Sequence, residues 1–197
     1  ATVEEYNTLA ALSNFSGIQG TGAYIIVDGF AEIQAADTSL LSGADSVTAN
    51  GTDGDDNLNM IMVDTGLTIN AGTGDDDIVG TAAQDSITGG DGDDTFVLFS
   101  SDSGLTSATV DTIEDFGADN ASDLLDVATA GDANNFHELD GTAGDIDSIE
   151  AALTAAVGVL DGTHMYVFVY DTDEADGYFI VDEDLDGTAD YGIILTG

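Results

Sequence analysis

Three nine-residue segments follow one another without a gap between residues 71 and 97: AGTGDDDIV, GTAAQDSIT and GGDGDDTFV. Each has an aspartate at its sixth position (Asp76, Asp85 and Asp94) and a large apolar residue at its eighth. Self-similarity at a fixed short period is typical of chains that wind into stacked coils, in which every repeat forms the same unit. The period therefore predicts a coiled β structure that carries carboxylates at regular intervals.

The geometry of such a coil predicts which aspartates meet. The last residues of each repeat form a short strand whose eighth side chain points inward, and the Gly-rich first six form a turn. Two nonapeptides complete one coil, so repeats 18 residues apart should stack. Asp76 and Asp94 then share one edge, and Asp56, 20 residues before Asp76, extends it. Asp85 lies on the opposite edge, where the spacing places Leu67 rather than an acid in the preceding coil.

The repeats extend over roughly residues 51 to 99. The segment GTDGDDNLN at 51–59 matches the template G-G-x-G-x-D-x-U-x, in which U is large and apolar. Residues 60–70, MIMVDTGLTIN, form one degenerate repeat with two extra residues, which predicts a bulged or loosely wound turn. Downstream, Asp111 keeps the Asp-x-apolar spacing and is a further candidate for one of the two edges.

The charge of the chain limits what these carboxylates can bind. There are 40 Asp and Glu residues and no Lys or Arg, which gives a formal net charge of −40, and 43% of the residues are hydrophobic, enough for a core. Such a chain does not bind nucleic acid through phosphates, does not adhere to an anionic membrane, and has no apolar run long enough for membrane insertion. High acidity also fits a solubilised surface in a salty medium, which leaves the nine-residue period unexplained.

Carboxylate and carbonyl oxygens are the ligands that calcium prefers. We expect about two to five calcium ions in this zone, since each takes six to eight oxygens. Metal binding would then contribute to folding, with a loose chain in its absence. The candidate ligands are Gly51, Asp53, Gly54, Asp56, Gly72, Gly74, Asp76, Asp85, Gly90, Gly92, Asp94 and Asp111.

A second candidate calcium site lies in DEDLDGTAD, near the end of the sequence. Asp182, Asp184 and Asp186 occupy positions 1, 3 and 5 of an EF-hand-like loop. Asp190 occupies position 9, but Ile193 stands at position 12, where a bidentate Glu is required, so a full EF-hand is excluded. A calcium-binding loop and a polar hairpin turn between two strands both fit this segment.

The remaining predicted elements are short. The clearest helix covers 147–157, with Asp147 and Glu150 as an N-terminal capping box, and another helix is predicted at 2–12. Strands and a helical turn are predicted from β-branched and alternating patterns. The strands lie at 23–28, near Val47, and at 164–171, 178–182 and 191–195, with the helical turn between the first two.

The nonapeptides resemble those of the repeats-in-toxin (RTX) family, whose parallel β-roll binds calcium. The segment VDTIEDFGADNASDLLDV resembles the linker after the roll, and the last strands resemble those of serralysin-type proteases and related exoproteins. The stretch from AYIIVD to TANGT is similar to β-helical repeats of bacterial surface-layer and adhesin-like RTX proteins. The resemblance implies a mainly β fold, a right-handed parallel β-roll or β-helix with a C-terminal β-strand cap and one or two short helices.

The resemblance also implies a function. We expect an N-terminal lead-in at 1–50, the calcium-binding roll at 51–128, and a C-terminal cap and secretion-signal region at 129–197. The chain would leave the cell through type I secretion machinery and fold at the bacterial cell surface. There it would serve as the C-terminal part of a surface-layer, adhesin or filament protein, with calcium-bridged self-association.

Catalysis is not expected from this chain, because it contains neither an H-E-x-x-H nor a G-x-S-x-G pattern. His137 and His164 are predicted to be surface or strand residues rather than metal ligands. An alternative function remains open: the chain would be the secretion and folding domain of a longer protease or lipase whose catalytic domain lies upstream.

Overall fold

The computed structural model describes residues 25–35, 41, 44, 46–100, 102–118, 122–131, 134–140, 146–170 and 176–196. The helix predicted at 2–12 lies outside these residues. In chain order the described elements are β1 (Ile25–Gly29), α2 (Phe30–Ala35), β2 (Ser46–Asn50), β3 (Asn57–Asn59), β4 (Thr68–Thr73), β5 (Asp77–Val79), β6 (Ser86–Asp91), β7 (Thr95–Leu98), β8 (Asp111–Ile113), β9 (Leu124–Val127), β10 (Phe136–Asp140), α4 (Ile149–Ala156), β11 (Tyr166–Tyr170), β12 (Gly177–Val181) and β13 (Tyr191–Leu195). The fold is therefore mainly β, as predicted.

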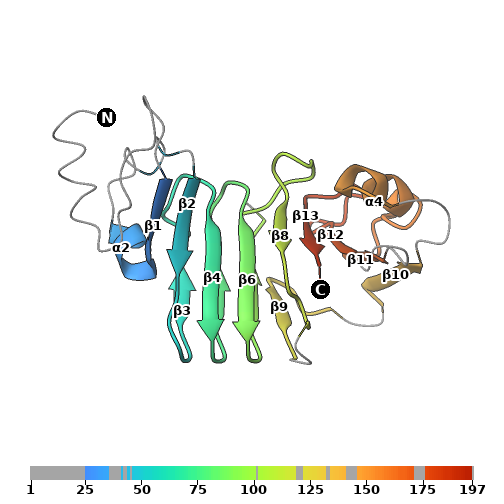
Figure 1. Ribbon diagram of the computed structural model, residues 1–197. Helices are drawn as coiled ribbons and strands as arrows, with labels where there is room; N and C mark the ends of the chain where they lie inside the picture. Colours follow the sequence, from blue (N-terminus) through green and yellow to red (C-terminus); the bar gives the residue numbers. More distant parts are fainter. Residues whose placement is uncertain are drawn as a thin grey trace.

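Two sheets lie face to face, and their parallel strands β2 to β7 form a β-roll (Figure 1). The chain alternates between them: β2, β4 and β6 belong to one sheet, and β3, β5 and β7 to the other. Ile69 pairs in register with Ile87, and Ile78 with Phe96, each two nonapeptides later in the sequence. The predicted coil of two repeats is thus confirmed.

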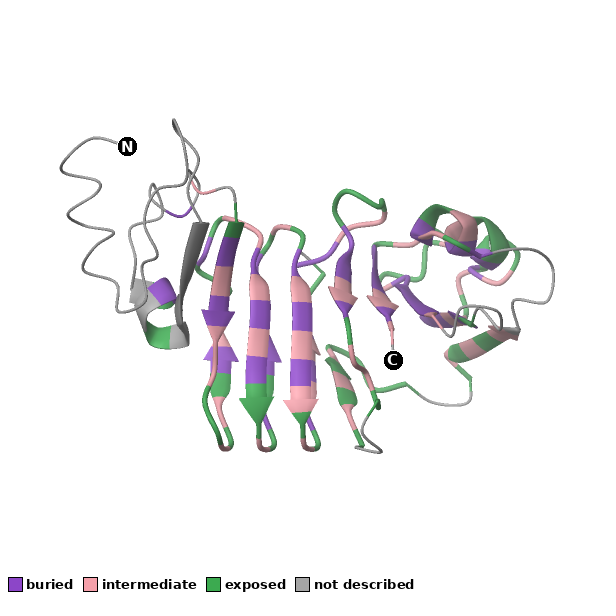
Figure 2. Ribbon diagram, viewed as in Figure 1, coloured by how far each residue is buried: buried purple, intermediate pink, exposed green. Residues whose placement is uncertain are grey.

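The eighth-position side chains form the core of the roll. Leu58, Ile78 and Phe96 follow one another across β3, β5 and β7, and Ile69 and Ile87 do so across β4 and β6. None of these five side chains exposes more than 4% of its surface. Because successive strand residues face opposite sides of a sheet, burial alternates along β4 and β6 (Figure 2).

The degenerate repeat contains the predicted bulge. Met60 and Val63 are buried, and the Val63 N–H donates a hydrogen bond to the Met60 carbonyl oxygen at 2.8 Å. Between them, Ile61 and Met62 are exposed. The two extra residues therefore loop outward without breaking the pairing of β3 with β5.

The larger sheet continues past the roll, through β13, β12, β11 and β10. The three predicted tail strands are confirmed as β11, β12 and β13, joined in antiparallel order. Strand β10 was not predicted, because its sequence FHELD contains two acids and too few β-branched residues to stand out. Strands from residue 25 to 195 thus belong to one sheet, which extends across the domain boundaries expected at residues 50 and 128. Those domain boundaries remain a prediction.

Helix α4 packs on one face of this C-terminal extension. Its buried residues Ile149, Ala152 and Ala156 belong to the same apolar cluster as Val167 and Ile180 of β11 and β12. Neither α4 nor α2, the helices of the described residues, is long and apolar enough to cross a membrane.

The predicted capping box of α4 is wrong. Ser148, not Asp147, is the N-cap: its backbone is extended, with φ of −161°, and its Oγ accepts a hydrogen bond from the Ala151 N–H. Glu150 instead accepts a hydrogen bond from the Ser107 N–H at 2.8 Å. The two candidate caps are adjacent in sequence, and only the backbone conformation distinguishes them.

Replacing Ser148 by alanine is expected to lower the free energy of unfolding by about 1 kcal/mol, because the Ala151 N–H loses its acceptor. Urea denaturation would measure the change. Asp147→Ala is the matched control and should leave the midpoint unchanged. An equal loss in both variants would contradict the assignment of Ser148 as the cap.

Candidate metal site

The turns at one end of the coils bring the sixth-position aspartates into a ladder (lower end in Figure 1). Asp76 Oδ1 accepts a hydrogen bond from the Asp56 N–H at 2.7 Å. Asp94 Oδ1 accepts one from the Asp76 N–H at 2.9 Å, and Asp123 Oδ1 accepts one from the Asp94 N–H at 3.0 Å. Each carboxylate therefore binds the backbone of the preceding coil, in the order that the spacing predicted.

The opposite edge contains a second ladder. Asp85 Oδ1 accepts a hydrogen bond from the Leu67 N–H at 2.7 Å, and Asp111 Oδ1 accepts one from the Asp85 N–H at 2.8 Å. Asp111 thus belongs to the Asp85 edge, a choice that the sequence left open. Its own N–H donates to Ser103 Oγ at 2.8 Å. Ser103 and the buried Asp102 were missed, because they precede Asp111 in a loop that does not follow the repeat.

Burial raises the pKa of these carboxyl groups. Desolvation is the largest cause, and it raises the pKa of Asp94 to about 6 and that of Asp111 to about 8. The pKa values of Asp76 and Asp85 are raised for the same reason. Hydrogen bonds from backbone N–H groups oppose the shift, and neighbouring carboxylates add to it. With no Lys or Arg in the chain, no basic side chain offsets these costs.

The second residue of each repeat divides the turns into two forms. We call the first the Thr form. Thr52 and Thr81 donate their backbone N–H groups to the Oδ2 atoms of Asp56 and Asp85, at 2.6 and 2.5 Å. Their hydroxyl groups donate to the same carboxylates at 2.9 and 3.0 Å. A Thr-form turn therefore satisfies its own carboxylate.

We call the second the Gly form, found at 71–76 and 89–94. Gly72 and Gly90 have φ of +125° and +107°, a conformation that L side chains rarely adopt. The Oδ2 atoms of Asp76 and Asp94 are buried and have no hydrogen-bond partner among the described residues. A side chain on Gly90 would also overlap the Gly72 carbonyl oxygen, so threonine does not fit there. A Gly-form turn therefore leaves a buried carboxylate oxygen without a donor, an arrangement that is costly unless a cation meets it.

Thr81→Val is expected to destabilise the chain by about 1–2 kcal/mol, because the hydroxyl hydrogen bond to Asp85 Oδ1 is lost inside the protein. Since the Thr form closes its turn without metal, the loss should be equal with calcium and with a chelator. Thermal unfolding under both conditions would measure it. A loss seen only with calcium would assign this turn to metal binding.

The fifth-position aspartates form a further ladder, on the surface. Asp55 Oδ1 accepts a hydrogen bond from the Asp75 N–H at 3.1 Å, and Asp75 Oδ1 accepts one from the Asp93 N–H at 3.0 Å. Asp93 Oδ1 in turn accepts one from the Ser122 N–H. All three aspartates are exposed, and the paired DD in three repeats is the sequence signal of this ladder.

The other predicted ligands of this edge lie in the same turns. Asp53 is exposed and forms a bridge with Thr73. The Gly51 N–H donates to the Asn70 carbonyl oxygen, and the Gly74 N–H donates to the Asp91 carbonyl oxygen at 2.8 Å each. Gly54, Gly74 and Gly92 stand at equivalent positions of successive turns, at 51–56, 71–76 and 89–94.

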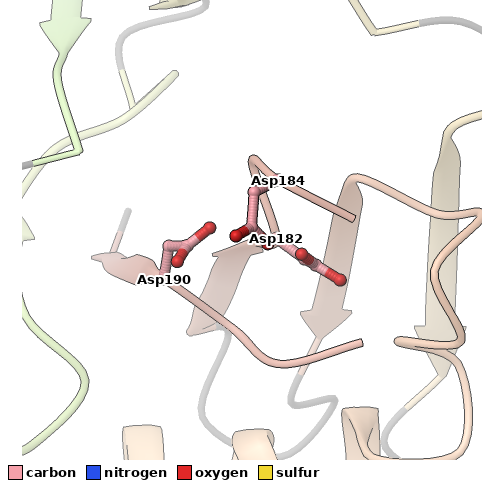
Figure 3. A group of neighbouring side chains, drawn as sticks. All are labelled: Asp182, Asp184 and Asp190. Atoms are coloured by element: carbon pink, nitrogen blue, oxygen red, sulfur yellow. The ribbon is translucent and has the colours of Figure 1, made fainter. Parts of the chain in front are cut away.

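The hairpin between β12 and β13 brings three of its four predicted ligands together (Figure 3). Carboxylate oxygens of Asp182, Asp184 and Asp190 lie within 4.8 Å of one another, whereas Asp186 is not part of this group.

Hydrogen bonds within the hairpin occupy these carboxylates. The buried Asp182 accepts hydrogen bonds from the Asp186 and Gly187 N–H groups at 3.1 and 2.9 Å. Asp190 Oδ2 accepts one from the Glu183 N–H at 2.8 Å. These hydrogen bonds close the turn, and the polar hairpin and the calcium-binding loop both fit this geometry.

His137 and His164 lie on the C-terminal side of the molecule, with ring centroids 5.2 Å apart in an edge-to-face arrangement. His164 Nδ1 also contacts Thr163 Oγ1 at 3.2 Å and Asp161 Oδ1 at 3.4 Å. Neither histidine forms part of the aspartate ladders described above.

The similarity of this chain to known proteins is found in solved structures. No protein-family model matches it, and no curated protein does. The solution structure of the AlgE6R3 subunit from the Azotobacter vinelandii mannuronan C5-epimerase is similar, with 20% identity over 75% of this chain and 73% of that one, and a TM-score of 0.36. That score is too low to establish a common fold, so the β-roll is assigned from the strand pairings of this chain.

Proposed function

We propose that this chain is a calcium-dependent β-roll module that folds outside the cell, with its metal held by the Gly-form turns. One observation carries the proposal: Asp76 and Asp94, in consecutive coils, each have a buried Oδ2 atom without a hydrogen-bond donor. Two such oxygens on one edge are costly in an apo protein and useful in a metal-bound one.

The donor set suits calcium. Each Gly-form turn has a buried carboxylate oxygen without a donor, and hard oxygen ligands are those that calcium takes. Bound calcium would supply the positive charge that the chain lacks, and would hold Asp76 and Asp94 in the ionised state. Asp56 and Asp85, satisfied by Thr52 and Thr81, would serve chiefly as turn-closing acceptors.

This assignment supports a role at the bacterial cell surface. Extracellular modules bind calcium with Kd values of about 10⁻⁴ to 10⁻³ M, so such a roll would remain loose in a calcium-poor cytoplasm and order itself outside. We further propose that it forms part of a surface-layer, adhesin or filament protein of the RTX type, exported by type I secretion. A protease or lipase motif in the gene upstream of Ala1 would instead favour the role of an enzyme's folding domain.

The proposal is tested by thermal unfolding and far-ultraviolet circular dichroism in a chelator, in millimolar magnesium and in millimolar calcium. Calcium is expected to increase β-structure and stability, by about 2.7 kcal/mol per site at 100 times Kd. Magnesium should do much less, because it demands a small octahedral site. Identical spectra and midpoints in chelator and calcium would overturn the proposal.

A further inference from the structure

The two sheets of the roll end at different places. The smaller sheet ends at β9, whereas the larger one continues through β13, β12, β11 and β10 (Figure 1). Within the described residues, no strand of the smaller sheet therefore faces the inner side of these four strands. The space beside β9 is where a fifth strand of the smaller sheet would lie.

Among the described residues, no strand pairs with the outer edge of β9. The Leu124 N–H donates to the Asp94 carbonyl oxygen at 2.8 Å, so it points toward β7. Because N–H directions alternate along a strand, those of Leu125 and Val127 point the other way. In the part of the chain that the structure describes, neither of these two groups is hydrogen-bonded to another strand. Leu125 is also only half-buried, although it pairs with the fully buried Phe96 of β7.

Beside this edge lies a cavity of about 340 Å³ with an aromatic lining. We call the cavity and the free edge of β9 the β9 groove. Phe116, Phe136, Phe168, Tyr170, Phe179 and Leu125 line the cavity. Phe136 and Tyr170 are 39% and 38% exposed, so the aromatic surface reaches solvent. These aromatic side chains form an apolar surface on which the apolar side chains of an added strand would pack.

Acidic side chains flank the groove. Asp126 alternates with Leu125 on β9 and is exposed on the outer face of that strand. Glu138, also exposed, pairs in register with Phe168. A second copy of this chain is a poor occupant, because each copy has a formal net charge of −40 and no basic residue to place beside these acids.

We propose that the β9 groove binds an extended segment of another protein, apolar at every second residue and basic between, which adds to β9 as a fifth strand. Strand addition would satisfy the outward N–H groups of Leu125 and Val127 with main-chain hydrogen bonds. Alternate apolar residues of the segment would face the aromatic lining, and the basic residues would lie beside Asp126 on the outer face. The inference depends on the fold and not on the calcium assignment.

The test is fluorescence anisotropy with a labelled ten-residue peptide of alternating Val and Lys, in calcium and at physiological salt. A peptide of equal composition, with all Val before all Lys, has the same charge but cannot present two faces. The alternating peptide should bind about tenfold more tightly, and Tyr170→Ala should remove most of this difference. Equal affinities of the two peptides would overturn the proposal.

Charge reversal locates the site. Asp126→Lys should weaken binding of the alternating Val–Lys peptide by about fivefold and strengthen an alternating Val–Glu peptide. Asp77→Lys, an exposed change on β5 of the same sheet, is the matched control and should have little effect, because salt screens charges beyond about 8 Å. Equal effects of Asp126→Lys and Asp77→Lys would show that the net charge of the chain attracts the peptide non-specifically. Dimers in sedimentation that the alternating Val–Lys peptide dissociates would assign the groove to a second copy. Circular dichroism confirms that each variant folds.

Discussion

Replacing Asp76 and Asp94 together by asparagine is expected to abolish most of the stabilisation that calcium gives to this chain. Both Oδ2 atoms are buried without a donor, and both carboxyl pKa values are raised by desolvation. Asparagine keeps an oxygen that accepts the N–H of the preceding coil but removes the negative charge. In a chelator the double variant should therefore be at least as stable as the parent, whereas in calcium it should lose about 2.7 kcal/mol per site at 100 times Kd.

The change in stability of the double variant in a chelator distinguishes a role of the two aspartates in calcium binding from a purely structural role. A purely structural role of the two aspartates would make the variant less stable in chelator and in calcium alike. Asp77→Asn with Asp91→Asn is the matched control, since these exposed residues lie in the same two repeats and change the net charge equally. Calorimetric titration should show calcium binding retained in the control and lost in the double variant. Retained binding in both would contradict the assignment of the Gly-form turns.

The period of the sequence predicted more of the site than its composition did. Inward side chains such as Ile78 and Phe96, and the edge shared by Asp76 and Asp94, follow from a coil of two nonapeptides. The division into Thr-form and Gly-form turns did not follow. It depends on whether the second residue adopts a positive φ and on where its N–H points, and the template treats Thr52 and Gly72 as variants of one position.

Residues outside the repeats were harder to predict for a physical reason. Asp115 and Asp123 close the last coil of the Asp94 edge: Asp115 accepts hydrogen bonds from the N–H groups of Gly89 and Gly90, and Asp123 accepts that of Asp94. Asp123 keeps the Asp-x-apolar spacing with Leu125, but an irregular loop sets the distance in sequence of both aspartates from these partners, so the nine-residue period does not predict the contacts. The exposed strand edge of β9 likewise arises from where one sheet stops, which only the assembled topology shows.

Lowering the pH is expected to stabilise the calcium-free chain. The ordinary pKa of an aspartate is 3.8, and in the folded chain those of Asp94 and Asp111 are raised to about 6 and about 8. Between pH 4 and 8 the folded state therefore binds more protons than the unfolded state, so the free energy of unfolding falls as the pH rises. Since each pKa unit corresponds to about 1.4 kcal/mol, thermal midpoints in chelator should differ by several degrees between pH 5.5 and pH 8.5.

Calcium should oppose this trend, because it binds the ionised carboxylates and competes with their protons. The midpoint in calcium is then expected to change less with pH, and the gain from calcium should shrink as the pH falls through about 6, where Asp94 takes up its proton. Asp111→Asn distinguishes the two edges. It should remove much of the fall in apo stability up to pH 8, yet leave the calcium response of the Asp76 and Asp94 turns intact. An apo midpoint that rises with pH would show that ionisation of these carboxyl groups does not destabilise the folded chain, and would contradict the raised pKa values of Asp94 and Asp111.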